Sequence, residues 1–225
     1  MFLACCFNGS LCAQSDAQIY ERTCDAKTYP FSDPSPVATP NNSYYPYFRF
    51  DGFSMQAQEK QWKMVVLEND YVKLTVTPEI GGKIWGAIDK VNNKEFVYTN
   101  GVVKFRDVAM RGPWTSGGIE FNFGIIGHAP TCSTPIDYLT KKNVDGSVSC
   151  HIFSYEWITR TVWNVEINLP KDKAYFTTHT TWFNQSSIDQ PYYQWMNAGY
   201  ATKTGTRFYY PGTYSIAVSY THLRA

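Results

Sequence analysis

The sequence has no apolar run long enough to cross a membrane as a helix and no long run of one charge. Asp, Glu, Lys and Arg make up only 17% of its 225 residues, and the formal net charge is +1. About a quarter of an average globular domain is charged. A nearly neutral chain without a basic run is poorly suited to a phosphate backbone, so nucleic acid is not expected as a partner. No transmembrane segment is predicted either, because such a helix needs about 20 apolar residues.

Several catalytic and metal-binding motifs are also missing. The sequence contains no GxxxxGK[ST] phosphate loop, no HExxH, no GxSxG and no His/Cys cluster at ligand spacing. We therefore predict no metal and no cofactor. Cysteine is scarce after residue 14. Only Cys24, Cys132 and Cys150 lie there, and they form no CxxC pair. Cys132 and Cys150 could form a bridge or stay as buried free thiols.

Aromatic residues are abundant, by contrast. The chain has 17 Tyr, 14 Phe and 7 Trp, which together make 17% of the sequence. Part of this excess must fill a core, but Tyr and Trp also offer flat amphipathic surfaces on which neutral ligands stack. Together with the low charge, this composition favours an uncharged ligand.

The two ends differ from the middle. Residues 1–14 combine an apolar stretch with small residues before a polar run, as at the end of a secretory signal, which predicts export to the periplasm or cell surface. Cys5 and Cys6 leave lipidation open. Residues 15–61, rich in Pro, Ser, Asn and Tyr, predict an extended, irregular lead-in. Residues 218–225, VSYTHLRA, resemble a non-native tail, so we expect the natural chain to continue past Ile216.

The middle of the chain, residues 62–217, predicts an all-β domain. Runs such as SVSCHIFSYEWI, TRTVWNVEINL and KAYFTTHTTWF alternate apolar and polar residues with a period of two. Turn signals separate the runs at residues 68–70, 81–82, 92–93 and 170–172. No helical stripe is present. This pattern predicts antiparallel sheets that pack face to face.

One segment, RGPWTSGGIEFNFGIIGHAP at residues 111–130, predicts a binding site. In a strand over IEFNF, Glu120 and Asn122 share one face while the apolar residues share the other. A sugar site needs flat apolar surface, which Trp114 offers, and planar hydrogen-bonding groups, which Arg111, Glu120 and Asn122 offer. The alternative is a buried Glu120–Arg111 ion pair with Trp114 in the core. His128 would point from the rim of the strand.

A second segment, YYQWMNAG, predicts another wall of the same cleft. Trp195 and Asn197 alternate on one strand face with Tyr193 beside them. The alternative is a buried aromatic strand.

Acid/base chemistry at this site would fall to Glu120, with His128 as its partner. A glycosidase needs two carboxylates roughly 5 to 10 Å apart, for which Asp107 and Glu156 are further candidates. His151 and His179 stand singly in predicted strands and are interpreted as surface or core residues.

The run LTVTPEIGGKIWGAIDKVNNKEFVY resembles the opening strands of galactose mutarotase-like domains. More closely, VVKFRDVAMRGPWTSGGIEFNFGIIGHAPTCSTPIDY and QPYYQWMNAG resemble an uncharacterised bacterial family, the domain of unknown function DUF5107, over residues 45 to 217. The resemblance implies an antiparallel β-supersandwich, incomplete at its C-terminus, that holds a carbohydrate on the concave face of one sheet. Family members are often exported, occur in glycan-degrading bacteria and, in longer chains, precede tetratricopeptide repeats.

A fold of this kind does not fix the reaction. We predict a carbohydrate-active domain that is epimerase-like or glycoside-cleaving in its full-length form. A non-catalytic glycan-binding module is the alternative, and a scaffold domain that precedes tetratricopeptide repeats is a further one.

Overall fold

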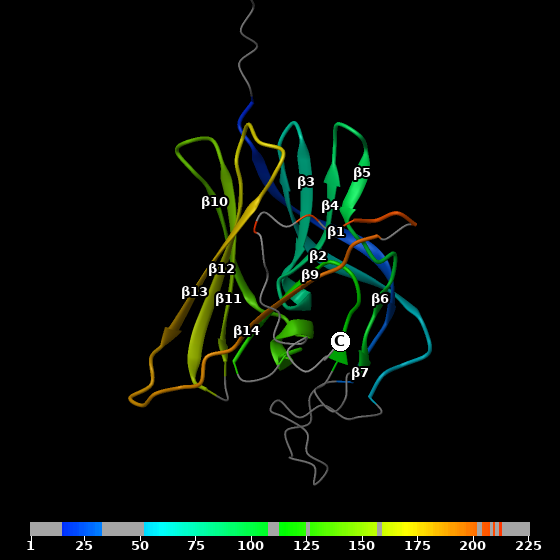
Figure 1. The fold of residues 1–225 in the computed structure, drawn as a ribbon. Helices are drawn as coiled ribbons and strands as arrows, with labels where there is room; N and C mark the ends of the chain where they lie inside the picture. Colours follow the sequence, from blue (N-terminus) through cyan, green and yellow to red (C-terminus); the bar gives the residue numbers. More distant parts are fainter. Residues whose placement is uncertain are drawn as a thin grey trace, which may run out of the picture.

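The computed structural model describes residues 15–32, 52–107, 113–124, 127–156, 159–201, 204–207, 209 and 212. They form two β-sheets that pack face to face as a sandwich (Figure 1). The predicted all-β fold is confirmed. Within the described ranges, helical geometry occurs only in two short 3-10 turns, η1 (Pro78–Ile80) and η2 (Pro130–Ser133).

The larger sheet has eight strands in the order β14-β9-β4-β3-β2-β1-β6, with β5 paired to β4. All pairs are antiparallel except β1 and β6, which run parallel, so this sheet is mixed rather than purely antiparallel as predicted. Its strands are β1 (Gln18–Tyr29), β2 (Gln58–Glu68), β3 (Val72–Thr77), β4 (Lys83–Asp89), β5 (Lys94–Val97), β6 (Val103–Lys104), β9 (Ile119–Phe123) and β14 (Gln194–Ala198).

The smaller sheet has four antiparallel strands in the order β10-β11-β12-β13. They are β10 (Asp137–Lys142), β11 (Val148–Glu156), β12 (Thr161–Leu169) and β13 (Thr177–Asn184). A separate two-stranded ribbon joins β7 (Arg106–Asp107) to β8 (Pro113–Trp114). The burial of β12 alternates strictly along its length, as the period of two in its sequence predicts.

The main core lies between the two sheets. Apolar residues of β2, β3, β4 and β9 face those of β11 and β12. Trp163 is fully buried there and stacks on Phe123 with ring centroids 4.7 Å apart. A second, smaller cluster that includes Trp62, Met64 and Trp85 lies on the opposite face of the larger sheet. Both faces of this sheet are therefore partly covered.

The predicted turns form where the sequence indicates them. Between β2 and β3, the side-chain oxygen of Asn69 accepts the backbone N–H groups of Tyr71 and Val72 at 2.8 and 2.7 Å. Gly81 and Gly82 both have positive φ, 65° and 66°, which glycine adopts without strain. A Cβ on Gly81 would lie 2.5 Å from the Cys132 backbone, so this turn packs directly against η2.

The interpretation of residues 15–61 as an irregular lead-in is wrong for its first part. Residues Gln18–Tyr29 form β1, the longest strand, which pairs with β2 along nearly its whole length. β2 also begins at Gln58, before the predicted start of regular structure.

Some predictions fall outside the described residues. The proposed signal at residues 1–14, the proposed tail at residues 218–225 and Arg111 all lie there. In the described part of the chain, no helix has the length and hydropathy that a membrane span requires.

Truncation of Trp163 tests the core. We expect Trp163→Ala to lower the free energy of unfolding by about 3–5 kcal/mol, because it removes a fully buried ring and leaves a cavity beside Phe123. Urea denaturation measures the change. Val144→Ala is the control, since Val144 is fully exposed, and it should stay within about 0.5 kcal/mol of the parent. Equal stability of both variants would contradict this packing.

Candidate functional site

Strand β9 divides its side chains between two environments, as its alternation predicts. Phe121 and Phe123 lie in the main core and are 2% and 1% exposed. Glu120 and Asn122 point to the opposite face of the larger sheet, where they too are buried, at 2% and 0% exposure. A carboxylate buried to this extent requires hydrogen bonds and a compensating charge.

Glu120 is held by two polar neighbours. Its Oε1 accepts the side-chain N–H of Asn122 at 2.6 Å and lies 2.8 Å from Nδ1 of His128. The side-chain oxygen Oδ1 of Asn122 accepts the backbone N–H of Ala129 at 2.7 Å. This hydrogen bond connects Ala129 to strand β9. His128 itself has a positive φ of 52°, an uncommon conformation for a residue with a side chain. The loop is thus shaped to bring His128 back over Glu120.

The second carboxylate oxygen of Glu120, Oε2, lacks the hydrogen bonds that Oε1 accepts. Oε2 is buried and has no hydrogen-bond partner among the described residues. A buried acceptor without a partner is rare, and at a functional site it marks a place that a water molecule or a ligand group can satisfy. Oε1 of Glu120 is therefore bonded to Asn122 and His128, while Oε2 is buried without a hydrogen bond among the described residues.

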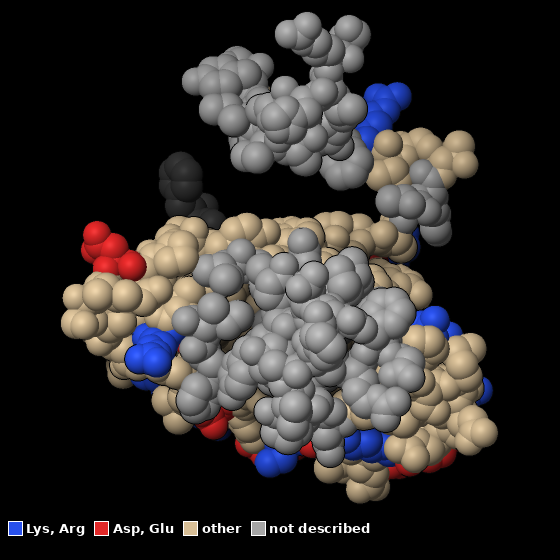
Figure 2. Space-filling model, turned by 90° about the horizontal axis from the view of Figure 1, so that it is seen from below, with Lys and Arg blue, Asp and Glu red and all other residues tan. Residues whose placement is uncertain are grey.

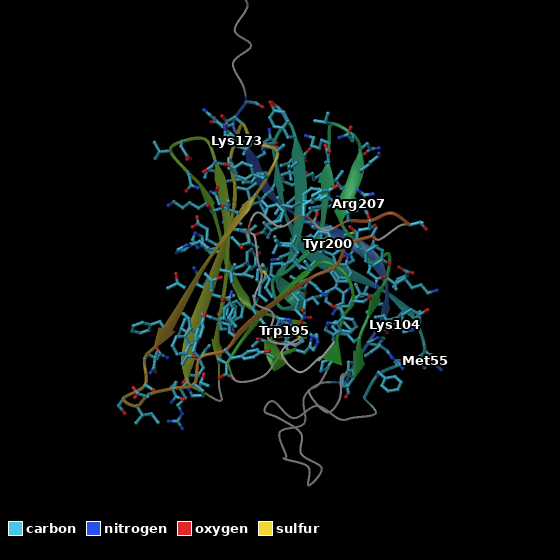
Figure 3. The ribbon with its side chains drawn as sticks, in the orientation of Figure 1. Met55, Lys104, Lys173, Trp195, Tyr200 and Arg207 are labelled. Carbon is cyan, nitrogen blue, oxygen red and sulfur yellow. The ribbon has the colours of Figure 1, made fainter. Side chains whose placement is uncertain are left out.

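Two tryptophans flank His128. The Trp114 ring meets the imidazole edge-on at 5.6 Å between centroids, and the Trp195 ring lies at 4.7 Å, tilted by 56°. The His128 side chain is 15% exposed between them. Figure 3 labels Trp195, which lies on β14, the edge strand that pairs with β9.

Strand β14 lies next to β9 and carries the residues of the second predicted segment. Its pairing with β9 sets Trp195 opposite Asn122 and Asn197 opposite Glu120, and directly opposed residues share one face of a sheet. Gly127 packs so closely that a Cβ there would lie 1.8 Å from the Trp195 ring and 3.0 Å from the hydroxyl of Tyr193. The structure thus brings Tyr193, Trp195 and Asn197 to the same place as the residues of the first segment.

Lys83 belongs to this site although the sequence did not single it out. It is 1% exposed at the start of β4, and its ammonium group donates to the carbonyl and hydroxyl oxygens of Thr115. Its Nζ lies 6.0 Å from the ring centroid of Trp85 and 5.9 Å from that of Trp114. Burial lowers the pKa of Lys83, and the negative charge of Glu120 opposes this shift.

The electrostatics keep Glu120 ionised. Burial raises the pKa of its carboxyl, but the hydrogen bonds from His128 and Asn122 and the charge of Lys83 outweigh burial, so the pKa lies below its usual value. An ionised carboxylate accepts hydrogen bonds only, so Nδ1 of His128 carries the proton in this contact. This arrangement fixes the imidazole and leaves Nε2 for proton transfer.

The other candidates lie elsewhere or have structural partners. Glu156 is buried at the end of β11, where its Oε2 accepts the backbone N–H of Thr159 at 2.6 Å. His151 and His179 lie on the outer face of the smaller sheet, one on each side of Glu166. The Asp107 side chain and all of Arg111 are outside the described residues.

The described residues contain no group of three His, Cys, Asp or Glu side chains placed to hold a metal ion. Cys132 and Cys150 are buried free thiols rather than a bridge. Burial raises the pKa of the Cys132 thiol and raises that of Cys150 to about 12, so both stay protonated near neutral pH.

Comparison with known proteins identifies the family. A model of the family described as "Domain of unknown function (DUF5107)" matches residues 39–223. This chain therefore belongs to the DUF5107 family.

A solved structure supports the same fold. The crystal structure of a TPR-domain containing protein from Parabacteroides distasonis ATCC 8503 superimposes with a TM-score of 0.74 at 27% sequence identity. The similarity covers 82% of this chain and 32% of that chain, so this chain spans about a third of its structural relative.

Acid titration tests the state of Glu120. Because its pKa is lower in the folded protein than the unfolded value of about 4.3, ionised Glu120 stabilises the fold above that pH. This contribution is lost as pH falls through the folded pKa. When the pH is lowered from neutral to acid, the free energy of unfolding of Glu120→Gln should fall less than that of the parent. Urea denaturation at each pH measures this free energy. The same acid dependence in both proteins would contradict an ionised Glu120.

Proposed function

We propose that this protein is a carbohydrate-active domain that binds a neutral sugar on the surface that Trp114, His128 and Trp195 form together. The observation that carries the proposal is the Glu120–His128 contact of 2.8 Å set between two tryptophan rings. Tryptophan faces suit the apolar C–H face of a sugar ring, and amide and carboxylate groups suit its hydroxyls. A histidine beside such a surface suits proton transfer to or from the bound sugar.

The charge distribution supports a neutral ligand. Basic and acidic side chains lie as separate small groups around the described surface at the lower end of the molecule (Figure 2). Inside the site, the buried charges of Lys83 and Glu120 have opposite sign. A site of this kind has no net attraction for an anion, so stacking and hydrogen bonding would select its ligand.

In this proposal His128 and Glu120 have different roles. His128 takes a proton from the sugar at Nε2, while Glu120 orients the ring through Nδ1 and stabilises the imidazolium that forms. Glu120 is only 2% exposed and ionised, which suits a positioning carboxylate better than a proton donor. This modifies the sequence-based hypothesis, which gave Glu120 the proton-transfer role.

The same geometry gives more support to one type of reaction than to the other. Direct glycoside cleavage commonly uses a pair of carboxylates. Of the two further carboxylate candidates, Glu156 is bound to the backbone of its own turn, and the Asp107 side chain lies outside the described residues. Among the described residues, proton transfer by His128 is the chemistry with the most support. We therefore favour an epimerase-like reaction over glycoside cleavage.

A non-catalytic glycan-binding module is the second candidate. The observation that favours it is the chain of hydrogen bonds from His128 through Glu120 and Asn122 to the Ala129 backbone, which would hold a binding surface rigid without any turnover. In either case we propose an exported protein, on the basis of the signal-like residues 1–14.

The structural relative supports a further, weaker candidate. That protein is described as TPR-domain containing, and this chain matches about a third of its length. A scaffold domain that works together with such repeats would need no sugar site.

Saccharide binding tests the proposal. Neutral monosaccharides and oligosaccharides are titrated into the protein and followed by saturation-transfer NMR. We expect Trp195→Ala to weaken binding at least about tenfold, as truncation of a central aromatic anchor does. His128→Ala should keep binding within a few fold and lower any turnover by about 10² to 10⁴.

The matched control is His151→Ala. His151 also faces a carboxylate, with its Nε2 3.7 Å from Glu166, but it lies on the outer face of the smaller sheet. This variant should bind and react like the parent. Binding of the sugar by Trp195→Ala at parental affinity would contradict the site. Binding without turnover in the parent would leave the binding module as the function.

A further inference from the structure

A groove lies on the face of the larger sheet to which Glu120 and Asn122 point. It has a volume of about 270 Å³ and is lined by residues of strands β1 to β6 and of the segment between β5 and β6. Met64 and Trp85, at 5% and 6% exposure, lie at its bottom and belong to the smaller cluster opposite the main core. The aromatic residues around His128 do not line it, so the groove is separate from the surface proposed above.

The size of the groove limits what it can hold. Sites that enclose a whole drug-sized ligand have volumes of roughly 300–1,000 Å³. At about 270 Å³, the groove suits one ring-sized unit rather than a complete extended ligand. A larger ligand held here therefore continues beyond the groove.

The groove combines an apolar floor with polar side chains that have free hydrogen-bonding capacity. Arg22, Asp25 and Glu95 line it, are exposed, and make no side-chain hydrogen bond or ion pair within the described part of the chain. Lys73 also lines it, so the groove has two basic and two acidic side chains. Such a balanced set has no net attraction for an ion, and each of these groups can hydrogen-bond to a sugar hydroxyl. The lining thus suits the same neutral class of ligand as the surface around His128.

Lys83 connects the floor of the groove to the candidate site. Its Nζ lies 6.0 Å from the ring centroid of Trp85, which lines the groove, and 5.9 Å from that of Trp114, which meets His128. The two tryptophans are therefore neighbours of one buried ammonium group. Groove and site lie next to each other on the same face of the sheet.

One wall of the groove is also hydrogen-bonded to both strands of the site. The side chain of Asn100, which lines the groove, donates to Oγ of Ser116 at 2.7 Å. The backbone N–H of Tyr98 donates to Gly199 at 2.9 Å, and its carbonyl accepts the N–H of Gly118 at 2.8 Å. Gly118 immediately precedes β9 and Gly199 immediately follows β14. These bonds fix the wall relative to the site, so a ligand that touches both places meets a preorganised surface.

We propose that this groove is a second saccharide subsite, so that the protein binds an oligosaccharide with one ring at His128 and another ring over Trp85. The inference rests on the proposed function, because it takes the surface around His128 as the first subsite. The balanced charges, the room for one ring and the position beside the first surface all match a neighbouring ring of the same glycan. Two subsites that engage one molecule together bind it more tightly than either subsite alone.

A comparison of sugar lengths tests this inference. Saturation-transfer NMR titrations measure the affinity of glucose, galactose, mannose and xylose, and of a linear tetrasaccharide of each. For a sugar that binds, the tetrasaccharide should bind at least about tenfold more tightly than the monosaccharide. The double substitution Arg22→Ala and Glu95→Ala should remove most of this gain and leave the monosaccharide affinity within about twofold of the parent. It removes one charge of each sign, so the net charge does not change.

Lys27→Ala combined with Glu59→Ala is the matched control. Both residues are exposed and oppose each other on β1 and β2, but neither lines the groove. This variant should keep the parental preference for the tetrasaccharide. Equal affinities for both lengths in the parent, or a preference that survives Arg22→Ala with Glu95→Ala, would overturn the second subsite and leave the proposed function standing. If none of these saccharides binds, the proposed function fails and the inference fails with it.

Discussion

Strand β9 buries apolar side chains on one face and a carboxylate on the other, and the carboxylate needs polar partners. The rest of the site depends on this constraint. Phe121 and Phe123 anchor the strand between the two sheets. Their packing fixes where Glu120 emerges on the opposite face. A buried carboxylate is costly unless hydrogen bonds and an opposite charge surround it. The neighbours that meet this need, Asn122, His128 and Lys83, are the groups that give the site its chemistry.

The aromatic walls follow from the same strand. Because β14 pairs with β9, the register that buries Phe121 also places Trp195 beside Asn122 on the opposite face. Gly127 then permits the loop to lie against the Trp195 ring, which no larger residue would allow. The position of His128 between Trp114 and Trp195 is therefore a consequence of sheet register and loop shape together.

Local patterns in the sequence predicted the fold class and much of the candidate site. The period of two in IEFNF separates Glu120 and Asn122 from the core residues, and β9 follows it. Alternation on β14 likewise places Trp195 and Asn197 on one face. β1 was missed because four of its twelve residues are charged and most are half-exposed or exposed, so no apolar face marks it. Its place in the sheet comes from the long pairing with β2, which no local pattern reveals.

Lys83 was missed for a related reason. A lysine after a Gly-Gly turn is normally a surface residue. Its burial depends on Thr115, which is distant in the sequence, and on the charge of Glu120. The contact between Nδ1 of His128 and Glu120 likewise forms only in the folded chain. Contacts of this kind are made only when distant segments meet, so they required the structure.

The most direct test of the central claim is the long-range ¹H–¹⁵N NMR spectrum of the histidine side chains, recorded with and without a neutral saccharide. The chain has four histidines, so each ring can be assigned by substitution. The account predicts that Nδ1 of His128 is protonated in the free protein and that its Nε2 signal shifts when the sugar binds, while His151 and His179 do not change. A proton on Nε2 instead of Nδ1, or a His128 signal unaffected by a bound sugar, would contradict it.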